Sequence, residues 1–435
     1  MDESAEKINA DGTQFASFLS FVLASHGSLE NQEDDTGLIS FTSYLERTFT
    51  AVTHATCSPY QKLFNEVTLN TIAENVTEDA YRIATRWIDQ RSNEALGAVV
   101  LWALDCILND LTDQKAGFGG SKSQVIMFLV ISMVLYKKPD ILISLLPMLR
   151  EDSRYYGQDK LPVIVWMTIQ ASQADLTVGL YIWAREILPI MGIESNPSPQ
   201  TTDLILHLVE SILSAPNAEQ ILLAGVVSKG ELLIPPSALN LLLHLTFPST
   251  PVKGTDRFEA IFSTLQWIAL ADVPGNNQKM QLAIEVQDYA FKSIGGGNAN
   301  LSERATRLFI WCLDVNPECF KLWDMIYEDN VEKSVVILKK IGKVLPRLDC
   351  YDDLRDTLAS FRQKNDKALS HRMDDARKAI FIEANQQCLE LLGGLSFRWR
   401  SQVTHLLKES IPYCCCIAFL ACLKVFPLDG IALKF

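Results

Sequence analysis

The sequence lacks an excess of basic residues, because 39 Lys and Arg stand against 52 Asp and Glu and leave a formal net charge of -13. Contacts with nucleic-acid phosphates need clustered Lys and Arg, so a general affinity for DNA or RNA is disfavoured. The low hydrophobicity of a disordered chain is also absent, since 48% of the residues are apolar. The mean hydropathy of +0.10 is high for a soluble protein and keeps membrane contact open.

The motifs that indicate common chemistries are missing as well. The ten cysteines form no CxxC pair, and the six histidines have no zinc-ligand spacing. No G-x-S-x-G motif of a serine hydrolase occurs. The loop Ala116–Ser123 contains Lys122, but a phosphate-binding loop needs Gly before that Lys, and Ser121 stands there. We expect no catalytic, cofactor-binding or metal-binding residues, no cofactor, and reduced, buried thiols of a cytosol-facing protein.

One acidic residue keeps an enzyme as an alternative. Asp105 interrupts the apolar run Val99–Leu108, and a buried carboxyl with a raised pKa can act in catalysis. More often, such an aspartate bonds to a neighbouring helix or faces solvent. His207, on a polar helix face, and His244, inside an apolar helix, are expected to be structural. We therefore favour a protein that is not an enzyme.

Apolar residues recur with the helical period almost everywhere, whereas strand-like alternation is nearly absent. In Thr201–Ser214, the polar residues Asp203, His207 and Glu210 share one face, and the opposite face is apolar. Proline- and glycine-containing breaks separate helices of roughly 10 to 20 residues. The sequence therefore predicts an all-α fold, an α-solenoid of stacked antiparallel helix pairs of the HEAT or armadillo type. The solenoid is expected to be irregular, because no strict sequence repeat is visible.

Helix starts and helix faces can be predicted at particular positions. Ser198 before Pro199 is typical of an N-cap followed by proline in the first turn. Asp175 is placed to cap the next helix start. A further apolar row consists of Val335, Leu338, Ile341 and Leu345, from which Lys333, Lys340 and Lys343 are expected to turn away.

Three stretches are poor in charge, and a spanning helix needs about 20 apolar residues. Leu161–Ala184 and Leu232–Val252 contain polar residues or prolines, so each is predicted to be a pair of buried helices joined by a polar turn. Ser410–Leu423 is short for a full span, although Arg398 and Arg400 nearby favour attachment at a membrane surface.

These patterns divide the chain into four parts. Residues 1–37 form an acidic flexible segment, 38–348 a helical-repeat (ARM-type) body, 349–409 a charged helical extension, and 410–435 an apolar, Cys-rich tail for membrane attachment.

One long block supports a family. Residues Gly157–Pro189 read GQDKLPVIVWMTIQASQADLTVGLYIWAREILP and resemble the most recognisable block of the transmembrane protein 214 family, in its plant form. Four further blocks agree in order, so that the resemblance covers roughly residues 40–390; they are Trp87–Leu108, Ser121–Glu151, Lys229–Pro248 and Arg257–Gly275.

The resemblance implies an endoplasmic-reticulum protein with a helical body and a C-terminal membrane attachment. Animal members are linked to stress-induced apoptosis because they hold a procaspase at the reticulum, which is a scaffolding role. No catalytic residues come with this family. Family members usually have a long polar N-terminal region that is missing or short here. Their C-terminal spanning helix is also longer than Ile411–Val425, so we expect truncated or alternative termini.

The hypothesis from sequence is therefore a non-catalytic scaffold of the endoplasmic reticulum membrane, with its body facing the cytosol, that recruits other proteins and no nucleic acid. One alternative is a multi-spanning membrane protein that uses Leu161–Ala184 and Leu232–Val252 as spans. Another is a soluble helical-repeat adaptor. Glycans on the sequons at Asn75 and Asn300 would indicate a lumenal body.

Overall fold

The computed structural model describes residues 85–115, 123–155, 157, 160–193, 198–225, 232–250, 254–271, 278–344 and 350–410. The acidic segment 1–37, the sequon at Asn75, the loop at Lys122 and the tail from residue 411 lie outside the described residues. Within the described ranges, every regular element is a helix and no strand occurs, so the predicted all-α class is confirmed.

The chain divides into two compact units, Met1–Ala271 and Asp272–Phe435, called here the N-terminal and the C-terminal unit. After a helical stretch at residues 85–89, the described part of the N-terminal unit contains ten α-helices and one π-helix. They are α6 (Asn93–Lys115), α7 (Ser123–Lys137), α8 (Asp140–Glu151), α9 (Leu161–Ala174), α10 (Leu176–Ile182), the π-helix η2 (Trp183–Ile187), α11 (Ile190–Ile193), α12 (Pro199–Leu213), α13 (Ala218–Ala224), α14 (Pro236–Thr246) and α15 (Thr255–Ala269).

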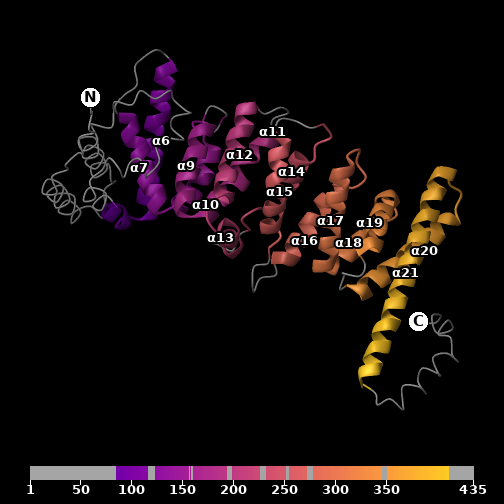
Figure 1. Ribbon diagram of the computed structural model, residues 1–435. Helices are drawn as coiled ribbons and strands as arrows, with labels where there is room; N and C mark the ends of the chain where they lie inside the picture. Colours follow the sequence, from indigo (N-terminus) through magenta and orange to yellow (C-terminus); the bar gives the residue numbers. More distant parts are fainter. Residues whose placement is uncertain are drawn as a thin grey trace, which may run out of the picture. The chain divides into compact units, whose positions relative to one another are not determined.

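Helices of the N-terminal unit pack mainly against helices that are close in sequence. Helix α7 lies against α6 and α9, and α9 lies against α10 and α12 (Figure 1). Farther along the chain, α12, α13 and α14 all pack against α15. This stepwise packing is compatible with the solenoid that the helical rhythm predicts.

The first charge-poor stretch folds as predicted and the second does not. Leu161–Ala184 contains α9 and α10, and the turn between them carries Asp175, whose carboxylate accepts a hydrogen bond from the Thr177 amide at 2.8 Å. Such a bond satisfies an amide that the first turn of a helix leaves free. In the described part of Leu232–Val252 there is one helix, α14, because the extended backbone at Pro235 prevents an earlier start.

A π-helix follows α10 directly, and the sequence pattern did not predict it. Its first residue, Trp183, is fully buried and donates its indole N–H to the Ile205 carbonyl of α12 at 2.9 Å. Its charged residues reach outward, since Arg185 donates to the Leu232 carbonyl at 2.8 Å and Glu186 pairs with Arg150 of α8. The π-helix therefore has contacts with three different segments of the N-terminal unit.

The C-terminal unit contains six described helices in two rows. They are α16 (Gln278–Ser293), α17 (Ala299–Val315), α18 (Glu318–Ile326), α19 (Val331–Val344), α20 (Tyr351–Leu369) and α21 (Asp375–Ser410). Helix α18 packs against α16 and α20, and α19 packs against α17 and α21, while α16 pairs with α17 and α20 with α21. Within this unit, each row stacks in chain order.

Buried aromatic rings connect four segments of the C-terminal unit, and we call them the aromatic column. The column passes from α16 through α17 and α18 to α20, with ring centroids 3.7 to 5.6 Å apart. Its members are Phe291, Phe309, Trp323, Phe361 and Tyr327. Since aromatic side chains bury a large area each, the column forms the centre of the core of this unit.

The predicted direction of two lysines on α19 is wrong. Val335, Leu338 and Ile341 are buried as expected, but Lys333 donates from Nζ to the Phe291 carbonyl at 3.0 Å, in the last turn of α16. Lys340 pairs with Glu303 of α17 at 3.0 Å. A lysine stem can cover apolar surface while its ammonium group reaches a polar partner on a neighbouring helix. Lys333 therefore faces the free carbonyls at the end of α16, and Lys340 faces Glu303 of α17.

Candidate functional site

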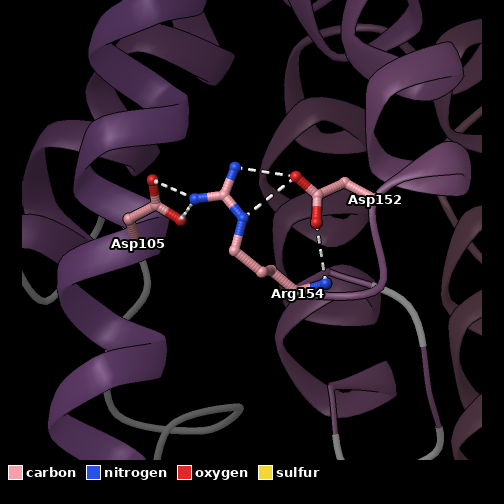
Figure 2. Close-up of polar contacts among 3 residues, drawn as sticks. All are labelled: Asp105, Asp152 and Arg154. Carbon is pink, nitrogen blue, oxygen red and sulfur yellow. Dashed lines mark hydrogen bonds and ion pairs between the residues drawn. The ribbon is translucent and has the colours of Figure 1, made fainter.

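Asp105, the acidic residue that kept an enzyme in view, lies on α6 with 35% of its side chain exposed. Figure 2 shows Arg154, from the segment after α8, between two carboxylates. The Arg154 Nη1 atom lies 3.4 and 3.3 Å from the two Asp105 oxygens. On its other side, Arg154 donates to Asp152 Oδ2 from Nε at 2.9 Å and from Nη2 at 2.7 Å.

The contacts within this cluster shift the pKa values of Asp152, Arg154 and Tyr155. Hydrogen bonds from Arg154 lower the pKa of Asp152, and the same carboxylate raises the pKa of Arg154. Burial, and secondly a hydrogen bond with Asp105, raise the pKa of Tyr155 to about 12. Tyr155 is thus neutral and Arg154 charged at ordinary pH. The partners of Asp105 are the Arg154 cation and the Tyr155 phenol. These contacts favour a structural role for Asp105, in which it links α6 to the segment after α8.

The histidines and other metal-ligating residues are dispersed. His207 is exposed on α12, while burial lowers the pKa of His244 on α14. Across the described ranges, no three His, Cys, Asp or Glu side chains gather as a metal ion would require.

Most of the described thiols are buried. Cys312, Cys319 and Cys388 are buried, whereas Cys106 and Cys350 are half-buried. Burial raises the pKa of both Cys319 and Cys388 to about 12. Because the thiolate is the reactive form, these two residues are inert at neutral pH.

The length and apolar character of each helix decide whether it could cross a membrane. In the part of the chain that the structure describes, no helix has both the length and the apolar character that crossing a bilayer requires.

Exposed apolar side chains are the feature that the sequence patterns missed, and they suit protein binding better than chemistry. In the N-terminal unit, Trp267 on α15 is 61% exposed. In the C-terminal unit, Met325 at the end of α18 is 78% exposed, and Ile382 and Leu389 on α21 are 51% and 48% exposed. The sequence contained a signal for Ile382 and Leu389, because they do not follow the helical spacing of the buried residues of α21. These buried residues are Phe381, Ala384, Cys388, Leu391 and Leu395.

Comparisons with known proteins agree on one family. A family model described as "TMEM214, C-terminal, caspase 4 activator" matches residues 296–417. Transmembrane protein 214 of Bos taurus is 23% identical over 295 residues, which cover 66% of this chain and 40% of the bovine protein. The Mus musculus protein of the same name is 23% identical over 283 residues, or 63% of this chain and 38% of its own length. This chain spans about two fifths of the length of these curated relatives. No solved structure matches it significantly.

Proposed function

The chain belongs to the transmembrane protein 214 family, and on this premise we propose that it is a non-catalytic helical scaffold of the endoplasmic reticulum membrane that recruits partner proteins. One observation carries the proposal. The segment 296–417, whose family model is named for caspase 4 activation, includes α17 to α21, which pack around the aromatic column and leave apolar side chains of α21 exposed. An activator that works by binding needs such a stable body with an exposed contact surface.

The absence of an enzymatic activity is part of the proposal. The pairing of Asp105 with Arg154 supports it, because this contact gives the carboxylate a structural role between α6 and the segment after α8. The raised thiol pKa values of Cys319 and Cys388 support it as well. If Asp105→Asn changes stability and nothing else, the alternative of an enzyme loses its candidate residue.

The proposed location is the membrane of the endoplasmic reticulum, with the helical body in the cytosol. The relatives are named transmembrane proteins, and the sequence after α21 contains the apolar stretch Ile411–Val425. The sequon residue Asn300 lies exposed near the start of α17, so a glycan could be attached to it without disturbing the core. Glycan mapping is therefore informative, and an occupied Asn300 would contradict a cytosolic body.

The proposed partners are proteins, and the family name points to the caspase class in a cell-death response. The full chain, fused to a proximity-labelling enzyme and expressed in its native cells, tests this proposal. We expect labelled reticulum proteins together with a reproducible set of partners that grows under reticulum stress. A pool that is wholly soluble and separate from the reticulum contradicts the membrane part, and labelling no richer than that of an unrelated reticulum protein contradicts the scaffold.

A further inference from the structure

Helix α21 is much longer than the two helices that pack on it. It has 36 residues, whereas α20 has 19 and α19 has 14. At a rise of about 1.5 Å per residue, α21 is about 54 Å long and α20 about 28 Å long. Because only the short segment 370–374 separates α20 from α21, α20 lies along little more than the first half of its partner. Figure 1 shows α21 continuing past α20.

The support that α19 gives to α21 also ends near the middle of the long helix. Lys339 of α19 pairs with Glu383 at 2.5 Å, and a methyl group on Gly342 would contact Leu391 at 3.6 Å. Helix α19 thus advances toward the C-terminal half of α21, and it ends at Val344, shortly after the second of these contacts. Both neighbours of α21 therefore support its first half.

Two consecutive glycines lie where this support ends. Gly393 and Gly394 are both helical and both exposed, and they are the only glycines among the residues of α21. A Cβ atom on Gly393 would have no other atom within 4 Å, so no neighbouring segment requires a glycine at this position. At Gly179 of α10, by contrast, a Cβ atom would collide with Ser172. Close packing explains Gly179, and it does not explain Gly393.

Paired glycines weaken a helix at a place without packing support. Relative to alanine, each glycine in a helix interior favours local opening by roughly fivefold, so a pair favours it by more than about tenfold. Gly and Ser pairs are among the few features at which helices bend sharply. The pair in α21 is therefore the point at which this helix bends most easily.

One buried side chain holds the straight form of α21 together across the pair. Leu395 directly follows the glycines and is only 8% exposed, as the last of the described buried residues of α21. Burying a leucine side chain stabilises the arrangement that buries it. A bend at the glycines carries Leu395 away from this place. The straight form and the bent forms thus differ by the burial of one leucine.

We propose that Gly393 and Gly394 form a hinge between a body-bound helix, residues 375–392, and a lever helix, residues 395–410, with Leu395 as the latch of the straight form. The apolar stretch Ile411–Val425 directly follows the lever helix in sequence. The purpose of the hinge rests on the proposed function: in a scaffold attached to a membrane through this stretch, bending lets the helical body tilt toward its partners. The bending itself requires no membrane.

Pulsed electron paramagnetic resonance on the purified full chain measures the bending. Spin labels are attached at Ile382, which is exposed on the body-bound helix, and at Thr404 on the lever helix. An encoded keto amino acid carries each label, because the chain contains ten cysteines. A straight helix gives one narrow peak at about 33 Å. We expect a broad distribution that extends to shorter distances, and a single narrow peak in the original chain overturns the proposal.

Variants of the hinge and of the latch should change this distribution in opposite directions. Gly393→Ala with Gly394→Ala should narrow it to the peak of the straight helix, and Leu395→Ala should shift it to shorter distances. The control, Lys378→Ala with Gln386→Ala, adds two alanines at exposed positions of the body-bound helix and should leave the distribution unchanged. The same distribution in the glycine variant and the original chain, or equal narrowing in the control, overturns the hinge.

Hydrogen exchange followed by mass spectrometry distinguishes a hinge from unfolding of the whole end of α21. The amides of residues 393–398 should exchange at least about tenfold faster than those of 383–392, and the glycine variant should slow them by about tenfold or more. The amides of residues 399–410 should exchange more slowly than those of 393–398, because the lever remains a helix. Equal rates throughout residues 393–410 overturn the proposal.

The hinge and the proposed function can fail separately. A broad distance distribution in a chain that labels no specific partners would leave the hinge in place and refute the scaffold. A narrow distribution in a chain that labels specific partners would refute the hinge and leave the scaffold in place.

Discussion

Both units of this protein use ion pairs between segments and contacts between aromatic rings, but among the described residues the rings form a continuous column only in the C-terminal unit. In the N-terminal unit, three arginines make inter-segment ion pairs that remain partly exposed. In the C-terminal unit, the aromatic column and a few buried polar hydrogen bonds connect the helices. Partly exposed ion pairs are screened by water and contribute little each, whereas buried aromatic contacts contribute several kcal/mol. The aromatic contacts of the C-terminal unit are therefore concentrated in one connected column, whereas those of the N-terminal unit, Phe128 with Trp166 and Phe247 with Phe262, are separate pairs.

Arg257 illustrates the first arrangement. It lies 36% exposed on α15 and donates from Nε and Nη2 to the two oxygens of Glu210 on α12, at 2.8 and 2.7 Å. A third contact joins its Nη1 atom to Asp203 at 2.5 Å. The hydrogen bonds with Glu210 raise the pKa of Arg257 above its ordinary value. One cation from α15 therefore pairs with two carboxylates on the predicted polar face of α12.

Tyr327 illustrates the second arrangement. Its hydroxyl group donates to Asn365 Oδ1 of α20 at 2.9 Å, and its ring stacks on Phe361 at 3.7 Å. Nearby, the indole N–H of Trp323 donates to the hydroxyl oxygen of Ser334 at 3.1 Å. Burial raises the pKa of the Tyr327 hydroxyl. Buried polar groups are costly when they lose a partner, so these bonds determine how α18, α19 and α20 fit together.

The largest expected effect tests the dependence of the C-terminal unit on its column. Phe361→Ala should lower the free energy of unfolding of that unit by about 3–5 kcal/mol, because a fully buried ring in contact with Trp323 and Tyr327 leaves a cavity. Hydrogen exchange followed by mass spectrometry measures the loss of protection in peptides from α18 and α20. Protection within about 1 kcal/mol of the original would show that the column is not central.

The second prediction tests how closely two helices of the N-terminal unit, α9 and α10, are packed. A methyl group at Gly179 of α10 would collide with the Cβ atom of Ser172 on α9, so Gly179→Ala should cost about 1–3 kcal/mol in urea unfolding. Gly297→Ala, between α16 and α17, is the matched control, because a methyl group there would have no other atom within 4 Å. An unchanged midpoint for Gly179→Ala would mean that α9 and α10 can separate.

A smaller effect is expected for the exposed ion pairs. Arg257→Gln should cost about 1 kcal/mol or less at low salt, since half-exposed pairs gain little over hydration. The cost should fall further at high salt, where the Debye length is only about 3 Å at 1 M. Urea unfolding at two salt concentrations measures both values. A loss as large as that of Phe361→Ala would remove the contrast between the units.

The last prediction is a pH dependence within the N-terminal unit, which is absent at neutral pH. The pKa of Tyr155 is raised from 10.0 to about 12, so the unfolded chain releases this proton at a lower pH than the folded chain. Its contribution to stability is complete below pH 10 and is lost as the pH rises toward 12. Tyr155→Phe should flatten the unfolding free energy over this interval, as measured by urea titrations at several alkaline pH values. An equal slope in both proteins would contradict the raised pKa.

Local features were predictable because neighbours in sequence create them. The N-cap at Ser198, whose hydroxyl oxygen accepts from the Thr201 amide at 3.1 Å, and the polar face with Asp203 and His207 follow from spacing alone. The direction of Lys333 was not predictable in the same way. Its helical position places it at the border of a polar face, and the nearby end of α16 attracts its ammonium group. The π-helix at Trp183 likewise depends on contacts with distant segments.

The candidate surfaces show the same division. The apolar run Val99–Leu108 does not indicate that Asp105 pairs with Arg154, because Arg154 lies forty-nine residues later in the chain. The absence of catalytic motifs could be seen in the sequence, but the exposed fraction of Ile382 and Leu389 on α21 could not, since it depends on where α19 and α20 lie.

The sequence by itself therefore determined the helical class, the cap residues, the buried side of individual helices and the resemblance to one family, because the helical period and short motifs act within a few residues. The tertiary structure decided which helices meet, that five aromatic rings form a column, that Asp105 is an ion-pair residue, and which side of α21 stays open. Those outcomes depend on contacts between residues far apart in the chain, whose packing is governed by the shapes of whole helices rather than by any local pattern.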